Sequence, residues 1–251
     1  NDVLMKHMVG REIDQLFPKK EVKTGKELLR VEKLGRTGFF KDITFQLHEG
    51  EILGLTGLVG AGRTELVQCI YGVEKLDEGE IYIEGKKVRN KNTQQGFKSG
   101  IGYVPEDRQL QGLLLPWSIA DNITLASIEK YSKHRILNYK RLLKGAKETA
   151  EKLEVKAVNI FEPAESLSGG NQQKVVVGKV LEGNAKIIIL DEPTKGVDVG
   201  SKASMYEIMG ELAQQGYGIL MISSEMPEVL GMCDRIIVMR QGRISGSMLR
   251  G

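Results

Sequence analysis

The amino-acid sequence predicts an α/β fold, and three observations lead to this prediction. Thirty glycines and six prolines separate short apolar runs from segments of helical period, which is the rhythm of alternating strands and helices. One aliphatic run ends in two carboxylates, and a glycine-rich turn joins another apolar run to a helix. The 251 residues are 41% hydrophobic and 27% charged, a globular composition that excludes disordered, collagenous and coiled-coil chains.

Net charge and hydropathy narrow the classes of function. The 36 Lys and Arg against 33 Asp and Glu leave a formal charge of +3, which demands neither a nucleic acid nor an anionic membrane as partner. Apolar runs such as Ile187–Leu190 are far shorter than the roughly 20 residues that cross a bilayer, so any membrane role is expected to be peripheral. Cys69 and Cys233 have no partner at metal-ligand spacing. They are expected to be reduced core thiols of a cytosolic protein, and a disulfide is the alternative that the sequence leaves open.

The first third of the chain is expected to hold a helix, a linker and a small antiparallel sheet. Val3–Phe17 has loose helical spacing and stops at Pro18, and the charged stretch Lys19–Glu27 follows as a linker. Because the chain starts with Asn1 rather than Met, this beginning is expected to be the tail of a preceding segment. The three segments that predict the antiparallel sheet are Leu28–Lys33, Asp42–His48 and Glu80–Ile83.

Strands and helices alternate through the rest of the chain, except in one stretch. The predicted strands are Ile52–Thr56, Ile101–Val104, Ile187–Leu190 and Ile219–Ile222. The predicted helices are Thr64–Tyr71, one from about Gly170, and Lys202–Gln215, and a closing hairpin turns across Gln241-Gly242. Between Ser118 and Val155 we expect no strand, only two helices, Ile119–Ile128 and Tyr139–Leu153. This predicts a helical insertion.

A glycine-rich turn between a predicted strand and a predicted helix is the strongest local signal. Its residues are Gly57, Leu58, Val59, Gly60, Ala61, Gly62, Arg63 and Thr64. Glycines let successive N–H groups converge on phosphate oxygens, and the helix start adds partial positive charge. This predicts a phosphate loop whose Thr64 hydroxyl reaches Mg²⁺, with a plain glycine turn as the alternative. Arg63 stands where lysine is expected, and a planar guanidinium does not simply replace a compact ammonium group.

Two carboxylates follow the most aliphatic run. Asp191 and Glu192 end the strand Ile187–Leu190, at the edge where α/β sheets bind ligands. We expect Asp191 to lie near Mg²⁺, directly or through water, and Glu192 to orient or deprotonate the water that attacks the γ-phosphate. The alternative, that both residues only form a turn, is weakened by the phosphate loop upstream.

A third segment has the composition of a helix start: Ser168 can cap a helix, and Gly169 and Gly170 leave N–H groups bare for a second phosphate contact. A plain cap is the alternative. Together and in this order, the phosphate loop, the segment Leu167–Lys174 and Leu190–Thr194 resemble the ATP-binding cassette (ABC) ATPases, over about Leu28–Gly246. The resemblance implies a P-loop NTPase fold with a RecA-like core, an antiparallel β subdomain and a helical subdomain at about residues 113–168.

In that family, two cassettes enclose ATP between the phosphate loop of one and the signature segment of the other. The resemblance therefore implies ATP and Mg²⁺ as cofactors. It also implies that the signature residues of this chain contact the nucleotide of a partner cassette, namely Ser168, Gly169, Gly170, Asn171 and Gln172.

A closer resemblance is to the second cassette of the fused ATPase subunits of ribose-, galactose- and xylose-type importers. It is carried by the arginine-containing phosphate loop and by Val104–Arg108, Gly196–Gly200 and Met8–Glu12. It implies that residues 1–27 are a linker or the end of a first cassette and that residues 28–251 are one nucleotide-binding domain. The implied partners are that first cassette, membrane permease subunits and, indirectly, a sugar-binding protein, with no nucleic acid. The implied place is the cytoplasmic face of the cell membrane.

Residues at this cassette's own phosphate-loop site depart from the family pattern. Besides Arg63, Glu106 matches a glutamine that senses Mg²⁺, and Ser224 matches a switch histidine. Serine is short and does not titrate near neutral pH, so it cannot polarise the attack as histidine does. Phe39 and Phe40 are candidates to stack on adenine, although core packing is favoured for both. Because the signature is intact, we expect a pair with one weak site, in which this signature activates the first cassette.

Other interpretations stay open at this stage. A regulatory half-cassette that binds nucleotide without hydrolysing it also suits Arg63 and Ser224. A soluble ABC ATPase of repair or translation shares the motifs, but the short helical insertion and Asn171–Gln173 speak against it. The apolar cluster Leu113–Trp117 could face a permease or the core, and the basic stretch Lys130–Arg135 is expected to be a solvated face rather than a nucleic-acid site.

Overall fold

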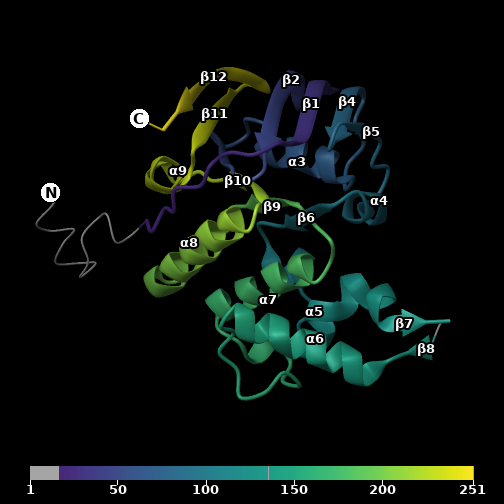
Figure 1. The fold of residues 1–251 in the computed structure, drawn as a ribbon. Coiled ribbons are helices and arrows are strands. Elements are labelled where there is room, and N and C mark those ends of the chain that lie inside the picture. The colour runs from purple at the N-terminus through teal and green to yellow at the C-terminus, as the bar shows by residue number, and fades with distance from the viewer. Residues whose placement is uncertain (1–16, 135, 251) are drawn as a thin grey trace, which may run out of the picture.

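A computed structural model describes residues 17–134 and 136–250 of the chain. The expected helix Val3–Phe17, apart from Phe17, and the segment Met8–Glu12 lie outside the described residues. Two sheets form the framework. The larger has the strand order β12-β11-β3-β10-β9-β6, and the smaller has the order β2-β1-β4-β5. Figure 1 shows the smaller sheet at the top beside β11 and β12, the strands β9 and β6 below it, and the helices α5 and α6 at the opposite end of the molecule.

The strands of the smaller sheet are β1 (Glu27–Arg36), β2 (Phe40–His48), β4 (Glu78–Ile83) and β5 (Lys86–Val88). The larger sheet contains β3 (Ile52–Gly57), β6 (Ile101–Val104), β9 (Ile187–Asp191), β10 (Gly218–Ile222), β11 (Arg235–Arg240) and β12 (Arg243–Leu249). All neighbours in the smaller sheet are antiparallel, as expected. In the larger sheet, β11 to β6 run parallel and only β12 is antiparallel. The carboxyl ends of the parallel strands therefore meet at one edge.

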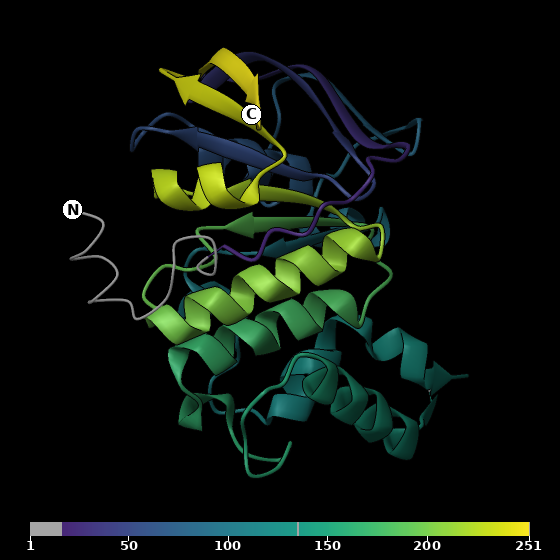
Figure 2. The same cartoon turned by 60° about the vertical axis from the view of Figure 1, so that its left-hand side comes forward.

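Both faces of the central strands are buried, which explains their continuous aliphatic sequence. Along β9, Ile187 and Ile189 belong to the apolar cluster under the smaller sheet, and Ile188 and Leu190 belong to the cluster on the other face. The first cluster includes α3 (Arg63–Tyr71). The second includes α7 (Gly169–Leu181) and α8 (Val199–Gln214), which Figure 2 shows side by side beneath the sheet.

The helical stretch differs from the expectation in two ways. The predicted single helix Ile119–Ile128 is wrong, because α5 (Ile119–Thr124) gives way to a 3₁₀ segment, η2 (Leu125–Tyr131), with a non-helical Ser127. The prediction of no strand is also wrong, because β7 (Ser132–Lys133) and β8 (Ile136–Leu137) pair as a minimal hairpin. The helix α6 (Tyr139–Lys152) then packs on α5, with Asn138 as its N-cap.

Short elements complete the fold. They are α4 (Thr93–Lys98), the π-helical turn η1 (Arg108–Gly112), the 3₁₀ turn η3 (Ala164–Ser166) and α9 (Met226–Met232). Both cysteines are free and buried, as predicted. No helix among the described residues is long and apolar enough to span a membrane.

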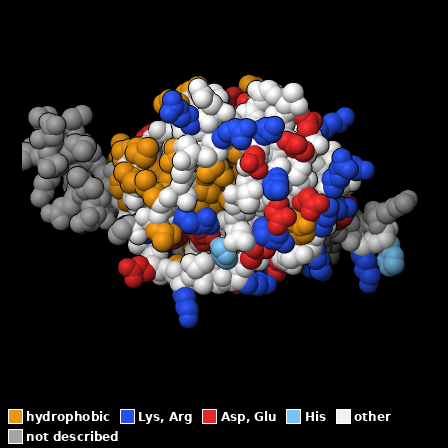
Figure 3. Space-filling model, turned by 90° about the horizontal axis from the view of Figure 1, so that it is seen from above, with side chains coloured by type: hydrophobic (Ala, Val, Ile, Leu, Met, Phe, Trp, Pro, Cys, Tyr) orange, Lys and Arg blue, Asp and Glu red, His pale blue; other side chains and the backbone are white. Residues whose placement is uncertain are grey.

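Charges of both signs intermingle over most of the face in Figure 3, with an apolar area at the end that carries α9 and β12. The exposed apolar side chains of these two elements are Met226, Leu230, Met248 and Leu249. Within the predicted apolar cluster, Leu113 is buried whereas Trp117 is 49% exposed, so the tryptophan is not a core residue.

Candidate nucleotide-binding site

The predicted phosphate loop joins β3 to α3, and its backbone geometry requires glycine. Gly57 and Gly62 have φ of 152° and 89°. A Cβ at Gly57 would lie 2.2 Å from the Met239 carbonyl oxygen, and one at Gly62 would lie 2.8 Å from that of Phe39. Neighbouring backbone thus closes around the loop on one side, while on the other Leu58 and Val59 are 81% and 93% exposed. The loop therefore has an exposed tip and leads into the N-terminus of α3, which is where a phosphate binds most readily.

Arg63 points back toward the carboxylate that was predicted to be catalytic. Its Nη1 lies 3.5 Å from Oε1 of Glu192, and both side chains are largely buried. Nη1 makes no hydrogen bond among the described residues. This guanidinium nitrogen is therefore held by charge alone and keeps its donor capacity for an anion.

Glu192 is fixed from a second side by Ser224. The Ser224 N–H and hydroxyl both donate to Oε2 of Glu192 at 3.2 Å. Glu192 itself has a left-handed φ of 48°, and its N–H donates to the Ile222 carbonyl at 2.9 Å. The backbone strain and the two contacts together hold the carboxylate between the phosphate loop and the end of β10.

Asp191 lies fully buried beside the start of α3. Its Oδ1 accepts a hydrogen bond from the Thr64 hydroxyl at 3.3 Å, and its Oδ2 accepts one from the Tyr103 hydroxyl at 3.1 Å. Burial raises the pKa of Asp191 to about 6, and the nearby carboxylates of Glu106 and Glu192 act in the same direction. A cation would relieve this excess of negative charge.

The oxygens of Thr64 and Asp191 fit Mg²⁺, which prefers hard oxygen ligands and usually keeps waters and substrate phosphates in its shell. Among residues 17–134 and 136–250, no group of three or more His, Cys, Asp and Glu is arranged to hold a metal ion. Thr64, Asp191 and Glu106 instead line one pocket of about 340 Å³, together with Tyr103 and Lys195. Thr64 and Asp191 would hold Mg²⁺ only together with nucleotide phosphates.

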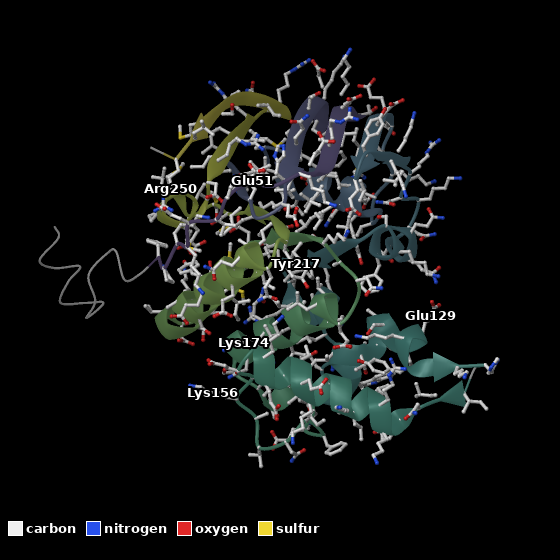
Figure 4. All side chains as sticks on the ribbon, viewed as in Figure 1. Glu51, Glu129, Lys156, Lys174, Tyr217 and Arg250 are labelled. Atoms are coloured by element: carbon white, nitrogen blue, oxygen red, sulfur yellow. The ribbon has the colours of Figure 1, made fainter. Side chains whose placement is uncertain are left out.

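The signature segment lies in a different hollow, of about 790 Å³, whose lining includes Gly170 and Asn171 but no described residue of the phosphate loop. Lys156 and Lys174, labelled in Figure 4, also line it. Ser168 caps α7 and accepts a hydrogen bond from the Asn171 side chain at 3.0 Å.

Two signature residues face inward or are closely packed. A Cβ at Gly170 would lie 2.1 Å from Oγ of Ser201, so only glycine fits there. Gln172 is buried, and its amide bonds to Ala164 and Gln109 at 3.3 and 3.1 Å. Both of its polar atoms therefore engage protein rather than an outer surface.

The two aromatic candidates for stacking on adenine, Phe39 and Phe40, differ in their exposure to solvent. Phe40 is buried, as its expected core role requires. Phe39 is 44% exposed, so the expectation of core packing is wrong for it, and the Arg36 guanidinium lies 4.4 Å from its ring centroid. The difference follows from the turn between β1 and β2, which leaves the first phenyl ring outside the sheet.

Two residues of the site escaped the sequence analysis. Tyr103 holds Asp191, as described above. The buried Glu228 accepts hydrogen bonds from Tyr206 at 2.6 Å and Ser223 at 2.9 Å, and also from Thr194. It ties the loop after Glu192 to the end of β10 beside Ser224. The sequence shows only an acidic residue at the fourth position after Ser224, and its burial is known only from the structure.

Comparisons with known proteins give the family of this arrangement. The family model described as ABC transporter matches residues 40–195. A ribose import ATP-binding protein of Rubrobacter xylanophilus is 46% identical over 98% of this chain and 50% of its own length. A ribose import ATP-binding protein of Bacillus subtilis is 44% identical over 98% and 50%. The chain therefore spans about half the length of the curated relatives it matches.

Solved structures agree with the fold. A nucleotide-free ATP-binding cassette from an ABC transporter has a TM-score of 0.76 at 25% identity, covering 90% of this chain and 92% of that one. An ADP-bound cassette of an ABC transporter has a TM-score of 0.76 at 26% identity, with the same coverage. The predicted P-loop NTPase fold, with its antiparallel β part and helical part, is confirmed. The chain belongs to the ABC transporter family and is an ATP-binding cassette of it.

Proposed function

We propose that this chain is the nucleotide-binding half of a subunit that energises the import of ribose or a related monosaccharide. The names of the relatives support the sugar, and their length, about twice that of the matched region, supports a fused pair of cassettes. In this proposal, residues 1–27 are a linker and residues 28–251 are the cassette. Its partners are the first cassette of the same subunit, membrane permease subunits and, indirectly, a sugar-binding protein. It acts at the cytoplasmic face of the membrane.

We further propose that the two nucleotide sites of the pair are unequal. The observation that carries this is the contact of Arg63 with Glu192, whose other oxygen is held by Ser224. The guanidinium would have to serve the nucleotide phosphates and the carboxylate at once. Glu192 would therefore activate water poorly at this site, because its charge is partly neutralised and its oxygens are occupied.

The residues take the following roles in this proposal. The backbone of Gly57–Thr64 binds the phosphates, and Arg63 adds positive charge there. Thr64 and Asp191 hold Mg²⁺, which neutralises phosphate charge, and Glu192 orients water. Ser168 and the start of α7 contact nucleotide bound by the first cassette, where the N-terminal dipole of the helix stabilises developing negative charge.

The test compares two variants in the assembled transporter. Ser168→Ala is expected to lower sugar-stimulated ATP hydrolysis by about 10²-fold, the usual effect of one lost transition-state contact. Glu192→Gln is expected to lower it by less than about threefold, because the proposed chemistry occurs at the other site. Ser166→Ala, beside the signature but bonded to the Pro163 carbonyl, is the matched control and should leave the rate unchanged. Loss of hydrolysis in Glu192→Gln with none in Ser168→Ala would reverse the assignment of the two sites.

The second candidate, a regulatory half-cassette, is also favoured by the Arg63–Glu192 contact. Calorimetric titration of Mg-ATP into this chain, followed by phosphate release in the same sample, separates the two. Binding without turnover supports a regulatory half, and turnover shows that Arg63 and Ser224 are compensated.

A further inference from the structure

The loop after β6 is fastened to the turn after Glu192. The side chain of Glu106 forms an ion pair with Lys195. Arg108 donates from Nη1 to the Lys195 carbonyl at 3.1 Å and from Nη2 to the Gly196 carbonyl at 3.3 Å. The sequence analysis singled out the segments Val104–Arg108 and Gly196–Gly200, and the structure brings them into contact. The proposed function gives neither segment a role so far.

The same loop also reaches the signature. A Cβ added to Gly169 would lie 2.6 Å from Nη2 of Arg108 and 3.4 Å from the Gly196 carbonyl oxygen. One residue further along the loop, Gln109 donates to the buried Gln172 at 3.1 Å. The guanidinium of Arg108 therefore fills the corner between the turn and the first residue of α7.

Local structure directs Arg108 into that corner. Oδ1 of Asp107 accepts the N–H groups of Gln109 and Leu110 at 3.1 and 3.0 Å, which caps the π-helical turn η1. Nε of Arg108 is buried and makes no hydrogen bond among the described residues. Burying it costs free energy, and the two carbonyl contacts of the same guanidinium offset that cost.

We propose that Glu106 and Arg108 are positioning residues for the signature segment. Glu106 holds Lys195 in place of sensing Mg²⁺, and Arg108 sets Gly169 against the turn Lys195-Gly196. This inference rests on the proposed function, because the signature then acts on nucleotide held by the partner cassette. The loop after β6 thereby contributes to catalysis at the partner's site more than at its own.

Reversal of the ion pair tests the first half of the inference. Glu106→Lys and Lys195→Glu, each alone in the assembled transporter, are expected to lower sugar-stimulated kcat by about fivefold or more, a typical coupling factor between sites. The KM for ATP should change little, because the nucleotide contacts are intact. The double variant Glu106→Lys/Lys195→Glu is expected to recover to within about twofold, since the pair is restored with opposite polarity.

If Glu106 instead senses Mg²⁺, the double variant is expected not to recover. Lysine at position 106 would then repel Mg²⁺, and the double variant would stay as inactive as Glu106→Lys, which would overturn the inference. Singles with unchanged kcat would overturn it as well. The matched control is the exposed ion pair of Lys98 with Glu129, of which Figure 4 labels Glu129 on the helical part. Reversing that pair should change no kinetic constant.

Two arginine variants test the second half. Arg108→Lys keeps the charge but cannot bridge two carbonyls, and Arg108→Met removes both. Both are expected to lower kcat about as much as the Glu106 variant, with the melting temperature monitored separately.

Ser168→Ala, measured in the same preparation, distinguishes failure of this inference from failure of the proposed function. If Ser168→Ala has no effect, the proposed function fails; if it abolishes activity while Glu106 and Arg108 variants are normal, only this inference fails.

Discussion

Among single residues, Arg63 is the one that most affects the site, because its guanidinium can pair either with Glu192 or with a nucleotide phosphate. Its Nη1 lies 3.5 Å from Glu192, yet the loop around it is shaped to receive phosphate. An arginine can reach the carboxylate because its guanidinium extends further and forks, whereas an ammonium group is compact. Arginine in place of the expected lysine therefore also changes the contacts of the Glu192 carboxylate before nucleotide binds.

We predict that Arg63→Lys tightens Mg-ATP binding to this chain by about tenfold, or about 1.4 kcal/mol, because the phosphates no longer compete with Glu192 for the cation. Isothermal calorimetry measures the change. Arg240→Lys, an equal replacement on the exposed end of β11, should leave the affinity unchanged. Weaker binding in Arg63→Lys would show that the fork of the guanidinium itself holds the phosphates.

The two thiols provide a prediction about pH. Burial raises the pKa of Cys69 to about 11 and that of Cys233 to about 12. Since the unfolded thiols ionise at lower pH, the folded state is favoured below pH 9 and loses this contribution as the pH rises through 11 to 12. We expect alkylation at pH 8 to be slower than that of a free thiol by about 10²-fold for Cys69 and more for Cys233. Rapid labelling of the native protein, measured by mass spectrometry against a urea-unfolded sample, would contradict this.

Sequence reasoning reached the residues of the site but not their partners. Spacing and residue type pick out Arg63, Asp191 and Glu192, because loops after parallel strands meet at one edge. The contacts of Arg63 with Glu192 and of Glu106 with Lys195 depend on side-chain directions across loops distant in sequence. No local pattern encodes those directions.

At the scale of elements, the strong periodicities gave correct predictions and the short elements did not. The aliphatic strand at Ile187–Leu190 and the helix after Ser168 appear within a residue or two of their expected bounds. The helices α4 and α9 have six and seven residues and contain Gly96 and Pro227, so neither has a readable period. Tertiary packing on neighbouring elements stabilises them instead.

Gly96 shows how closely α4 packs. A Cβ there would lie 1.9 Å from the Tyr71 carbonyl oxygen at the end of α3, and backbone cannot move aside as a side chain can. We predict that Gly96→Ala lowers the free energy of unfolding by about 1–3 kcal/mol, measured by chemical denaturation. Gly246→Ala, which meets nothing within 4 Å, is the control and should change it by less than about 0.5 kcal/mol. Equal effects would mean that α4 is displaced without cost.

At the scale of the whole molecule, one sheet separates two apolar clusters and belongs to both. Ile188 and Ile189 are neighbours in sequence, both fully buried, and they point into different clusters. The sequence predicts such a two-sided sheet from its unbroken aliphatic runs. It did not predict the division between the two layers, which depends on which helices cover which face.

We predict that Ile188→Ala and Ile189→Ala each lower the free energy of unfolding by about 2–5 kcal/mol, because each leaves a cavity in a packed layer. Calorimetry should show that both shift the same single transition, since the strand transmits the loss to both faces. Val158→Ala, at a side chain 90% exposed, is the control. Two separate transitions, each sensitive to only one variant, would show that the layers unfold independently.

The two edge strands of the larger sheet differ in length and in exposed apolar side chains, and this difference affects how incompletely folded chains associate. At one edge, β6 has only four residues and therefore offers few unpaired backbone groups to a passing chain. At the other edge, β12 has seven residues and exposes Met248 and Leu249. Strand addition between incompletely folded copies would thus begin at β12, which makes that edge the place to add a charged side chain when the cassette aggregates during expression.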